Sequence, residues 1–190
     1  MLRSCLAFAA TLAIAACSSG VGEVFDTRQN AGPCPPAASI YDAARIVVLD
    51  GDGELFRNIR YTGEITGVRF QCRYADEDPI RGELEIDFAF GRGPAGEAET
   101  HTYPFFVTIT RRDATVLARQ EFDLTADFDG GSIDAITETL RDITIPRIDA
   151  SISGANFEII VGFVLTDAEL QFNREGKRFR LDAQVGTTRP

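Results

Sequence analysis

The sequence predicts a mainly β protein, an antiparallel immunoglobulin/fibronectin-III-like β-sandwich with one short C-terminal helix. Two observations lead to this prediction. Apolar and polar residues alternate in many short segments, and clusters of Asp, Asn, Gly and Pro separate these segments as turns. Only one segment carries a strong helix signal. The chain contains no Trp, so the buried Trp that is typical of true immunoglobulin domains is absent.

The clearest strands are 68–74 and 84–90, in which every second residue is apolar. The stretch between them contains Asp-Pro and Arg-Gly and supplies the reversal of a hairpin. Five further strands are expected along the chain. They are 45–49, 58–61, 105–110, 115–124 and 156–165.

One segment, 132–146, fits two structures. Its first half, with Ile133, Ile136 and Leu140, has the spacing of a helix face. Its second half suits the end of an edge strand that Pro146 closes.

The helix signal begins at Thr166, which with Glu169 has the T-x-x-E spacing of a capping box directly after an apolar strand. We expect a short helix through Asn173. Residues 179–185 then alternate again and predict a last strand, before a loose tail at 187–190.

The N-terminal segment has the parts of a secretory signal: a positive charge at Arg3, an apolar stretch and small residues at its end. Its last residues and the one that follows, Ile14-Ala15-Ala16-Cys17, resemble the processing box of bacterial lipoproteins. This resemblance implies that 1–16 is a signal peptide and that Cys17 carries acyl chains, palmitate among them. Two or more such chains anchor a protein stably. An ordinary signal peptide with an incidental Cys17 is the alternative.

We expect the mature protein to lie in the cell envelope. The apolar stretch is too short to span a bilayer, which takes about 20 residues. By the sorting rule of enteric lipoproteins, Ser18 after Cys17 implies the outer membrane. The predicted location is therefore the periplasmic face of that membrane, held there by the acyl chains.

The mature chain suits a single domain behind a tether. Residues 17–33 are small, polar and Gly-containing and predict a flexible lipidated tether that spans at most about 55 Å. The sandwich is expected at 34–186.

The cysteine count predicts one disulfide. Of the four cysteines, Cys5 lies in the signal peptide and Cys17 is the lipid attachment site, so Cys34 and Cys72 remain. Two thiols in an oxidising compartment favour a bridge, which would stabilise the domain by about 3 to 4 kcal/mol in the loop-entropy model. Two free thiols or a metal-binding pair are the alternatives, and two thiols without histidines make a poor zinc site.

Several motifs resemble a group of uncharacterised envelope lipoproteins from alphaproteobacteria. They are the stretch 161–166 with Leu170 and Asn173-Arg174, the Cys34-Pro35 start and Cys72-Arg73-Tyr74. The resemblance covers most of the mature chain and implies no activity.

The charge excludes nucleic acid as a partner. The net charge is −10, and no basic cluster of the size that phosphate backbones require is present. No nucleotide-binding motif and no cofactor site is predicted.

Three carboxylates, Glu83, Glu85 and Asp87, share one face of a strand at about 7 Å spacing, which suits a pair of glycosidase acids. Directly paired residues of an antiparallel hairpin lie on the same face of the sheet. If the apolar residues of both strands face the core, Arg69 and Arg73 lie on the same face as these carboxylates. A solvent-exposed ladder of cross-strand charges is therefore the favoured interpretation.

Two other features have residue types that occur in functional sites. The acidic turns that begin at Asp50 and Asp127 offer oxygen ligands for calcium, but Asp and Gly are also what tight turns require. His101 is the only histidine and is expected in an exposed hairpin loop, without the partners of a catalytic base.

These observations favour a non-catalytic, membrane-anchored binding or structural module that contacts another envelope protein. The alternatives are a carboxylate-dependent hydrolase of envelope glycans and an accessory subunit of an envelope complex.

The lipid anchor predicts the behaviour of a single variant. Cys17→Ala removes the acylated residue, so the protein should move from the membrane fraction to the soluble fraction when cells are fractionated. Retention of the variant in the membrane would contradict the anchor.

Overall fold

The computed structural model describes residues 32–51 and 53–177. The predicted signal peptide, Cys17, most of the tether, the predicted strand at 179–185 and the tail lie outside these residues. Across the described ranges, no helix is both long and apolar enough to cross a membrane.

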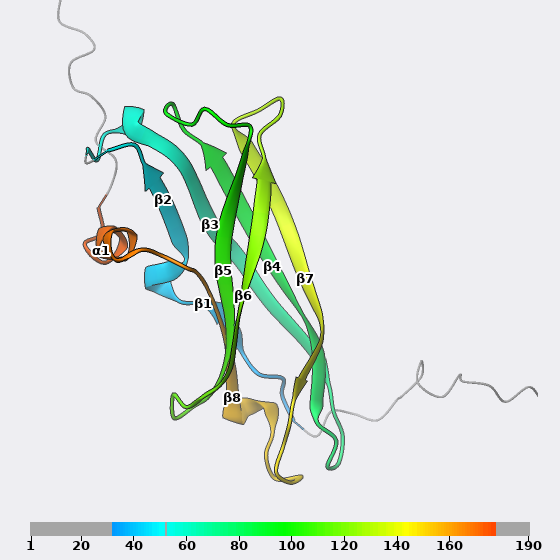
Figure 1. The fold of residues 1–190 in the computed structure, drawn as a ribbon. Coiled ribbons are helices and arrows are strands. Elements are labelled where there is room, and N and C mark those ends of the chain that lie inside the picture. Colours follow the sequence, from blue (N-terminus) through cyan, green and yellow to red (C-terminus); the bar gives the residue numbers. More distant parts are fainter. Residues whose placement is uncertain (1–31, 52, 178–190) are drawn as a thin grey trace, which may run out of the picture.

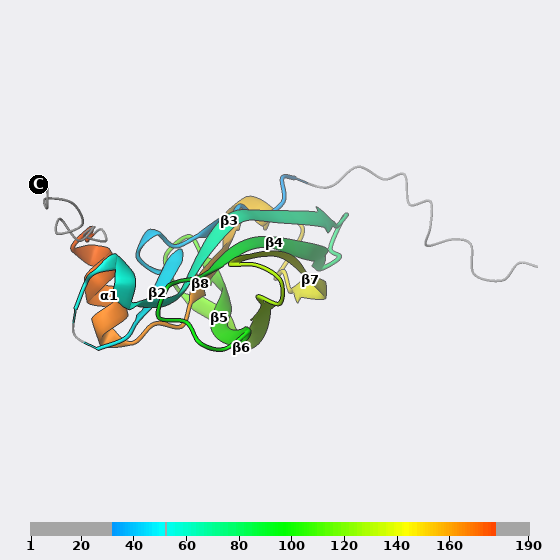
Figure 2. The ribbon, with the colours of Figure 1, turned by 90° about the horizontal axis from the view of Figure 1, so that it is seen from above.

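Two four-stranded sheets pack face to face, as Figures 1 and 2 show from two directions. Sheet A has the order β1 (Ala37–Ser39), β8 (Phe157–Phe163), β5 (Thr100–Arg111), β6 (Val116–Asp127). Sheet B has the order β2 (Arg45–Leu49), β3 (Ile59–Arg73), β4 (Ile80–Arg92), β7 (Ile133–Ile145). Neighbouring strands are antiparallel except for the short parallel pair of β1 and β8. Three 3₁₀ turns and one α-helix complete the fold: η1 (Tyr41–Ala43), η2 (Phe56–Asn58), η3 (Gly154–Asn156) and α1 (Asp167–Arg174).

The predicted fold class is therefore confirmed. The chain is a mainly β sandwich with one short C-terminal helix, the layered architecture that immunoglobulin and fibronectin type III domains also have.

Aromatic rings hold the two sheets together at their centre. Phe88 and Phe90 of β4 face Phe105 and Tyr103 of β5, with ring centres 5.1 Å apart for Phe88 and Phe105 and 4.3 Å apart for Phe90 and Tyr103. All four side chains are at most 2 % exposed. Such pairs contribute about 0.5 to 1.5 kcal/mol each beyond the burial of their area.

The predicted hairpin is the pair β3 and β4. Val68 lies opposite Ile86 and Phe70 opposite Leu84, so the apolar residues of both strands share the inner face. Arg69 lies opposite Glu85 on the outer face. The predicted parity of the pairing is confirmed.

β3 is one long strand where two shorter strands were predicted. Its buried residues are odd-numbered up to Ile65, whereas the inward residues are even-numbered from Val68 onward. A bulge between Ile65 and Gly67 shifts the register by one residue at this point. The bulge lets both halves of the strand turn their apolar side chains toward the core.

The ambiguous segment 132–146 is strand β7, so the helical alternative is wrong. Arg141 and Asp142 together occupy the place opposite a single residue of β4, and Asp142 has φ +60°. The helical spacing of Ile133, Ile136 and Leu140 arises before this bulge. Ile133 is 77 % exposed, and Glu138, opposite Ile86, occupies the inner position between Ile136 and Leu140.

The predicted helix is α1, and its capping box is present. Thr166 Oγ1 accepts from the Glu169 amide at 3.3 Å, and Glu169 Oε2 accepts from the Thr166 amide at 2.8 Å. Near the end of the helix, Asn173 Nδ2 donates to the carbonyl oxygens of Asp42 and Arg45, each at 2.8 Å. α1 therefore covers the outer edge of β2 (Figure 2).

The tight core predicts the effect of one added methyl group. A Cβ at Gly63 would lie 2.9 Å from Ile46 Cγ2 and 3.1 Å from rings of Phe90 and Phe163. Gly63→Ala should lower the free energy of unfolding by about 1 to 3 kcal/mol in urea titration, as overpacked cores do. Gly131→Ala is the control, because the nearest atom to its Cβ would be 3.9 Å away. Equal unfolding midpoints for the two variants would show that the core at Gly63 is loose.

Candidate functional site

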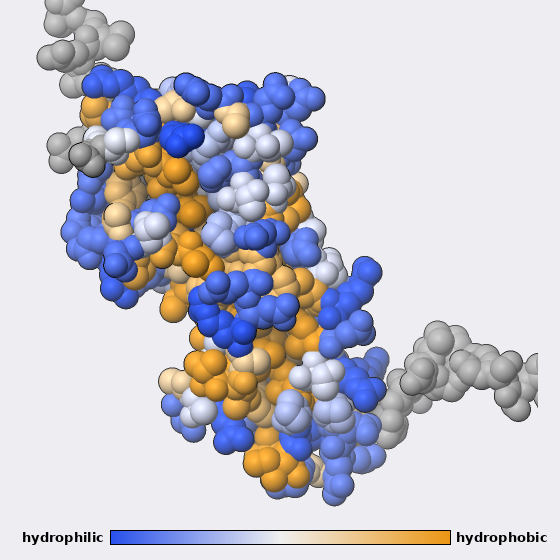
Figure 3. All heavy atoms as spheres, in the orientation of Figure 1, coloured by the Kyte–Doolittle hydropathy of each residue, from blue (hydrophilic) through white to orange (hydrophobic). Residues whose placement is uncertain are grey.

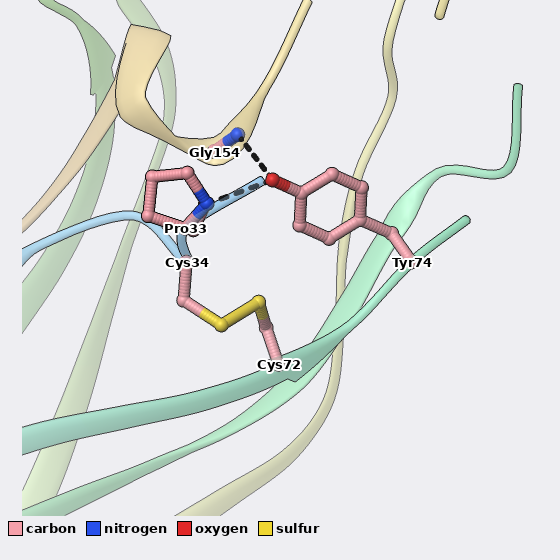
Figure 4. The surroundings of a disulfide bond; sticks show 5 residues. All are labelled: Pro33, Cys34, Cys72, Tyr74 and Gly154. Carbon is pink, nitrogen blue, oxygen red and sulfur yellow. Dashed lines mark hydrogen bonds between the residues drawn. A yellow bond between two sulfur atoms is a disulfide. The ribbon is translucent and has the colours of Figure 1, made fainter. Parts of the chain in front are cut away.

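A disulfide joins Cys34 to Cys72, with their Cα atoms 5.7 Å apart, as predicted (Figure 4). Cys34 comes three residues before β1 of sheet A, whereas Cys72 lies on β3 of sheet B. The bridge therefore ties the two sheets together at the place where the chain enters the sandwich.

Tyr74 fixes the chain beside the disulfide. Its side chain is buried, and its hydroxyl donates to the carbonyl oxygen of Pro33 at 2.8 Å and accepts from the amide of Gly154 at 3.0 Å (Figure 4). A Cβ on Gly154 would lie only 2.3 Å from the Pro33 oxygen, so this contact requires glycine. Pro33, which the sequence placed at the end of the tether, is thus held against the fold.

Arg147 supports Tyr74 from the other side. Its guanidinium lies 4.8 Å from the centre of the Tyr74 ring and donates to the carbonyl oxygens of Asp78 at 2.7 Å and Ile152 at 2.9 Å. These bonds join the turn after β3 to the loop before β8. We refer to Cys34, Cys72, Tyr74, Arg147 and Gly154 together as the anchor junction.

A groove lies between the edge strands β6 and β7, where the two sheets separate. Its volume is about 460 Å³. Figure 3 shows apolar side chains exposed in a band along the lower half of this face, between the positions of β6 and β7 in Figure 1. The apolar lining consists of Val107, Ile109, Ala118, Phe122, Leu140 and Ile143, and the polar lining includes Arg119, Gln120, Arg141 and Asp142.

The groove lies at the same end of the sandwich as the anchor junction. Cys72, Gly82 and Ile143 lie side by side on β3, β4 and β7. Because neighbouring strands are about 4.8 Å apart, Ile143 is about 10 Å from the disulfide-bonded strand.

The first half of β6 is exposed on both of its faces. Ala118 and Gln120 on the inner face and Arg119 and Glu121 on the outer face are all exposed. Arg119 is nevertheless ordered: its guanidinium lies 3.8 Å from the centre of the Phe106 ring and donates to Glu121 Oε1 at 2.9 Å. β6 therefore exposes a strand edge whose side chains are held by contacts within sheet A.

The three candidate carboxylates form a charge ladder on the outer face of sheet B. Arg69 bonds both Glu85, at 3.2 Å, and Asp87, while Arg141 of β7 donates to Glu83 at 3.1 Å. The hydrogen bonds from Arg69 and then from Thr137 lower the pKa of Asp87 below its ordinary value. The contribution of Arg141 could not be predicted, because β7 was not identified as a strand.

His101 and the acidic turn at Asp127 make contacts that stabilise the fold. His101 lies on β5 rather than in a loop, so that expectation was wrong; its ring stacks on Tyr61 with centres 4.1 Å apart, and burial lowers its pKa. Asp127 Oδ1 accepts from the amide of Asp129 at 2.8 Å, within its turn. Among the residues that the structure describes, no three His, Cys, Asp or Glu side chains are grouped as a metal site.

Comparison with protein-family models, curated proteins and solved structures gave no match to this chain.

The anchor junction predicts the effect of removing one hydroxyl group. Tyr74→Phe leaves the Pro33 carbonyl and the Gly154 amide without their buried partner, which should cost about 1 to 3 kcal/mol in the free energy of unfolding. Tyr41→Phe is the matched control, since Tyr41 is 82 % exposed. Chemical denaturation of both variants measures the difference, and equal stabilities would contradict the role of the Tyr74 hydroxyl.

Proposed function

We propose that the protein is a non-catalytic lipoprotein of the cell envelope, anchored through acyl chains on Cys17, that binds a partner envelope protein at the groove between β6 and β7. The observation that carries this proposal is the exposed apolar groove beside an open strand edge. Apolar grooves of this kind, bordered by polar residues, are typical of protein contact sites.

The chemistry of the groove favours a protein chain as the ligand. The edge of β6 offers backbone N–H and C=O groups, and the side chains of Val107, Phe122 and Leu140 offer apolar contacts beside it. A strand added to such an edge gains hydrogen bonds from the backbone and specificity from alternate side chains.

The anchor junction supports the same proposal. It joins the end of the tether rigidly to the end of the fold at which the groove opens. A partner in the same membrane would meet the groove at high effective concentration, so a modest contact area suffices for binding. An accessory subunit of an envelope complex would use the same surface.

The alternative of a glycan hydrolase finds less support. A glycosidase needs one carboxyl group with a raised pKa as general acid, whereas the pKa of Asp87 is lowered by Arg69. Glu83 and Glu85 are also paired with guanidinium groups, of Arg141 and Arg69. The three carboxylates are suited to stabilising sheet B.

Amide substitution separates the two functions. The triple variant Glu83→Gln, Glu85→Gln, Asp87→Asn should remain folded with a small loss of stability, because exposed ion pairs contribute little. Growth and envelope integrity of cells that carry it should equal those of wild type. A null phenotype with an unchanged thermal melt would favour the hydrolase instead.

Site-specific crosslinking tests the proposed surface. A photo-crosslinking residue at Ala118, in the groove, should give a discrete adduct in intact cells. The same residue at Ala135, exposed on β7 outside the groove, should give none. Equal labelling from both positions, or no adduct from either, would contradict the groove as the contact surface.

A further inference from the structure

We infer that the partner at this groove is a second copy of the same chain, joined by antiparallel pairing of the two β6 strands around a two-fold axis at Gln120. The inference rests on the proposed function, because it uses the same surface and names its occupant.

Among the four edge strands of the described fold, β6 is the one with an open and regular edge. β1 has only three residues, and α1 covers β2 by placing Asn173 on the Arg45 carbonyl. β7 is interrupted at Asp142 and places Glu138 on the inner face, opposite Ile86. Bulges and inward charges protect an edge from further pairing.

β6 has no such protection beyond its first residues. Its pairing with β5 is shifted once, between Val116 and Ala118, and is regular from Ala118 to Asp127. Its neighbouring side chains are exposed on both faces up to Glu121. Val116 and Leu117 are 59 % and 41 % exposed, so apolar surface lies next to the free edge.

Among the axes through Arg119, Gln120 and Glu121, the charges of β6 favour the one at Gln120 for self-pairing. In an extended sheet, an inner-face residue of one β6 strand must lie opposite an inner-face residue of the other. The two-fold axis must therefore pass between two copies of the same residue. An axis at Arg119 places two arginines opposite each other, and an axis at Glu121 places two glutamates opposite each other. An axis at Gln120 creates two equivalent pairs in which Arg119 of one copy lies opposite Glu121 of the other. No two like charges then lie directly opposite each other.

The inner face agrees with the same register. With the axis at Gln120, the two Gln120 amides face each other, and an amide can both donate and accept. Ala118 then lies opposite Phe122. Because β6 and β7 end their sheets on the same side of the sandwich, the two grooves come together beneath the paired strands, which covers their apolar lining.

This arrangement is compatible with two membrane anchors. Antiparallel pairing makes the two sandwiches point in opposite directions. The N-terminal segments before Cys34 therefore leave the dimer at its opposite ends. The predicted tether spans at most about 55 Å, which lets both anchors reach one membrane when the pair lies flat on it. Such a two-fold contact is self-complementary and closed.

Cysteine crosslinking of the full lipidated chain in its native envelope tests the register. Gln120→Cys places two thiols directly opposite each other and should give a covalent dimer on a non-reducing gel after mild oxidation. Ala118→Cys is the matched control on the same strand and face. Residue 118 of each copy lies opposite Phe122 of the other copy, so the two introduced thiols do not meet, and we expect at least tenfold less dimer. Mass spectrometry of the linked Cys34 and Cys72 peptide confirms that the native bridge is intact.

Charge exchange tests the complementarity. Adding Arg119→Glu or Glu121→Arg to Gln120→Cys should abolish the dimer band for each chain alone, since like charges then meet. Coexpression of the two variants with different tags should restore the band as a heterodimer. A dimer yield from Gln120→Cys no higher than from Ala118→Cys, or charge variants that crosslink like wild type, would overturn the inference.

The proposed function can stand without the inference. If the Ala118 photo-crosslink joins this chain to a different envelope protein, the groove is a contact surface but the second copy is not its occupant. If neither the photo-crosslinking residue at Ala118 nor Gln120→Cys gives an adduct, both proposals fail.

Discussion

The contact of aromatic rings between β4 and β5 is the interaction on which the rest of the structure depends. Phe88 and Phe90 meet Phe105 and Tyr103 between strands that are interior to their sheets, so the sheets are joined along their middle. Their sides are then closed in different ways. On one side α1 covers β2 through Asn173. On the other, β6 and β7 diverge and leave the groove open. The same packing that stabilises the fold therefore creates its candidate binding surface.

The anchor junction adds a second constraint at one end of this framework. The bridge from Cys34 to Cys72 connects the lead-in to sheet A with sheet B, and the Tyr74 hydroxyl and the Arg147 guanidinium satisfy backbone groups that meet there. Two sheets that are joined only by side-chain packing would respond to a pull on the N-terminus by sliding. The covalent bridge instead transmits such a load to β3, the longest strand. This is a physical reason for a disulfide at the base of the predicted tether.

Much of the fold could be predicted from the sequence, because strict alternation identifies half-buried strands and a capping box identifies a helix start. The hairpin of β3 and β4 with Arg69 opposite Glu85 and α1 at Thr166 were found in this way, and the pair Cys34 and Cys72 followed from the cysteine count. The failures occur where the alternation is broken or obscured. In β7 the exposed Ile133 and the inward Glu138 produced a helical spacing, and at the bulge before Gly67 one strand resembled two. His101 was placed in a loop because its neighbours are small, although Tyr61 stacks on it. The groove depends on how far β6 and β7 diverge, which no local pattern encodes.

The central claim is that the edge of β6 is covered in the envelope and open in the isolated protein. Hydrogen–deuterium exchange of the lipidated protein in its membrane, compared with the dilute Cys17→Ala protein, measures this directly. In the dilute protein, the amides of Ala118 to Leu124 that face the free edge should exchange rapidly, whereas in the membrane they should be protected. The amides of β5, which are bonded on both sides, should be protected in both states. Equal and rapid exchange of β6 in both states would contradict the claim.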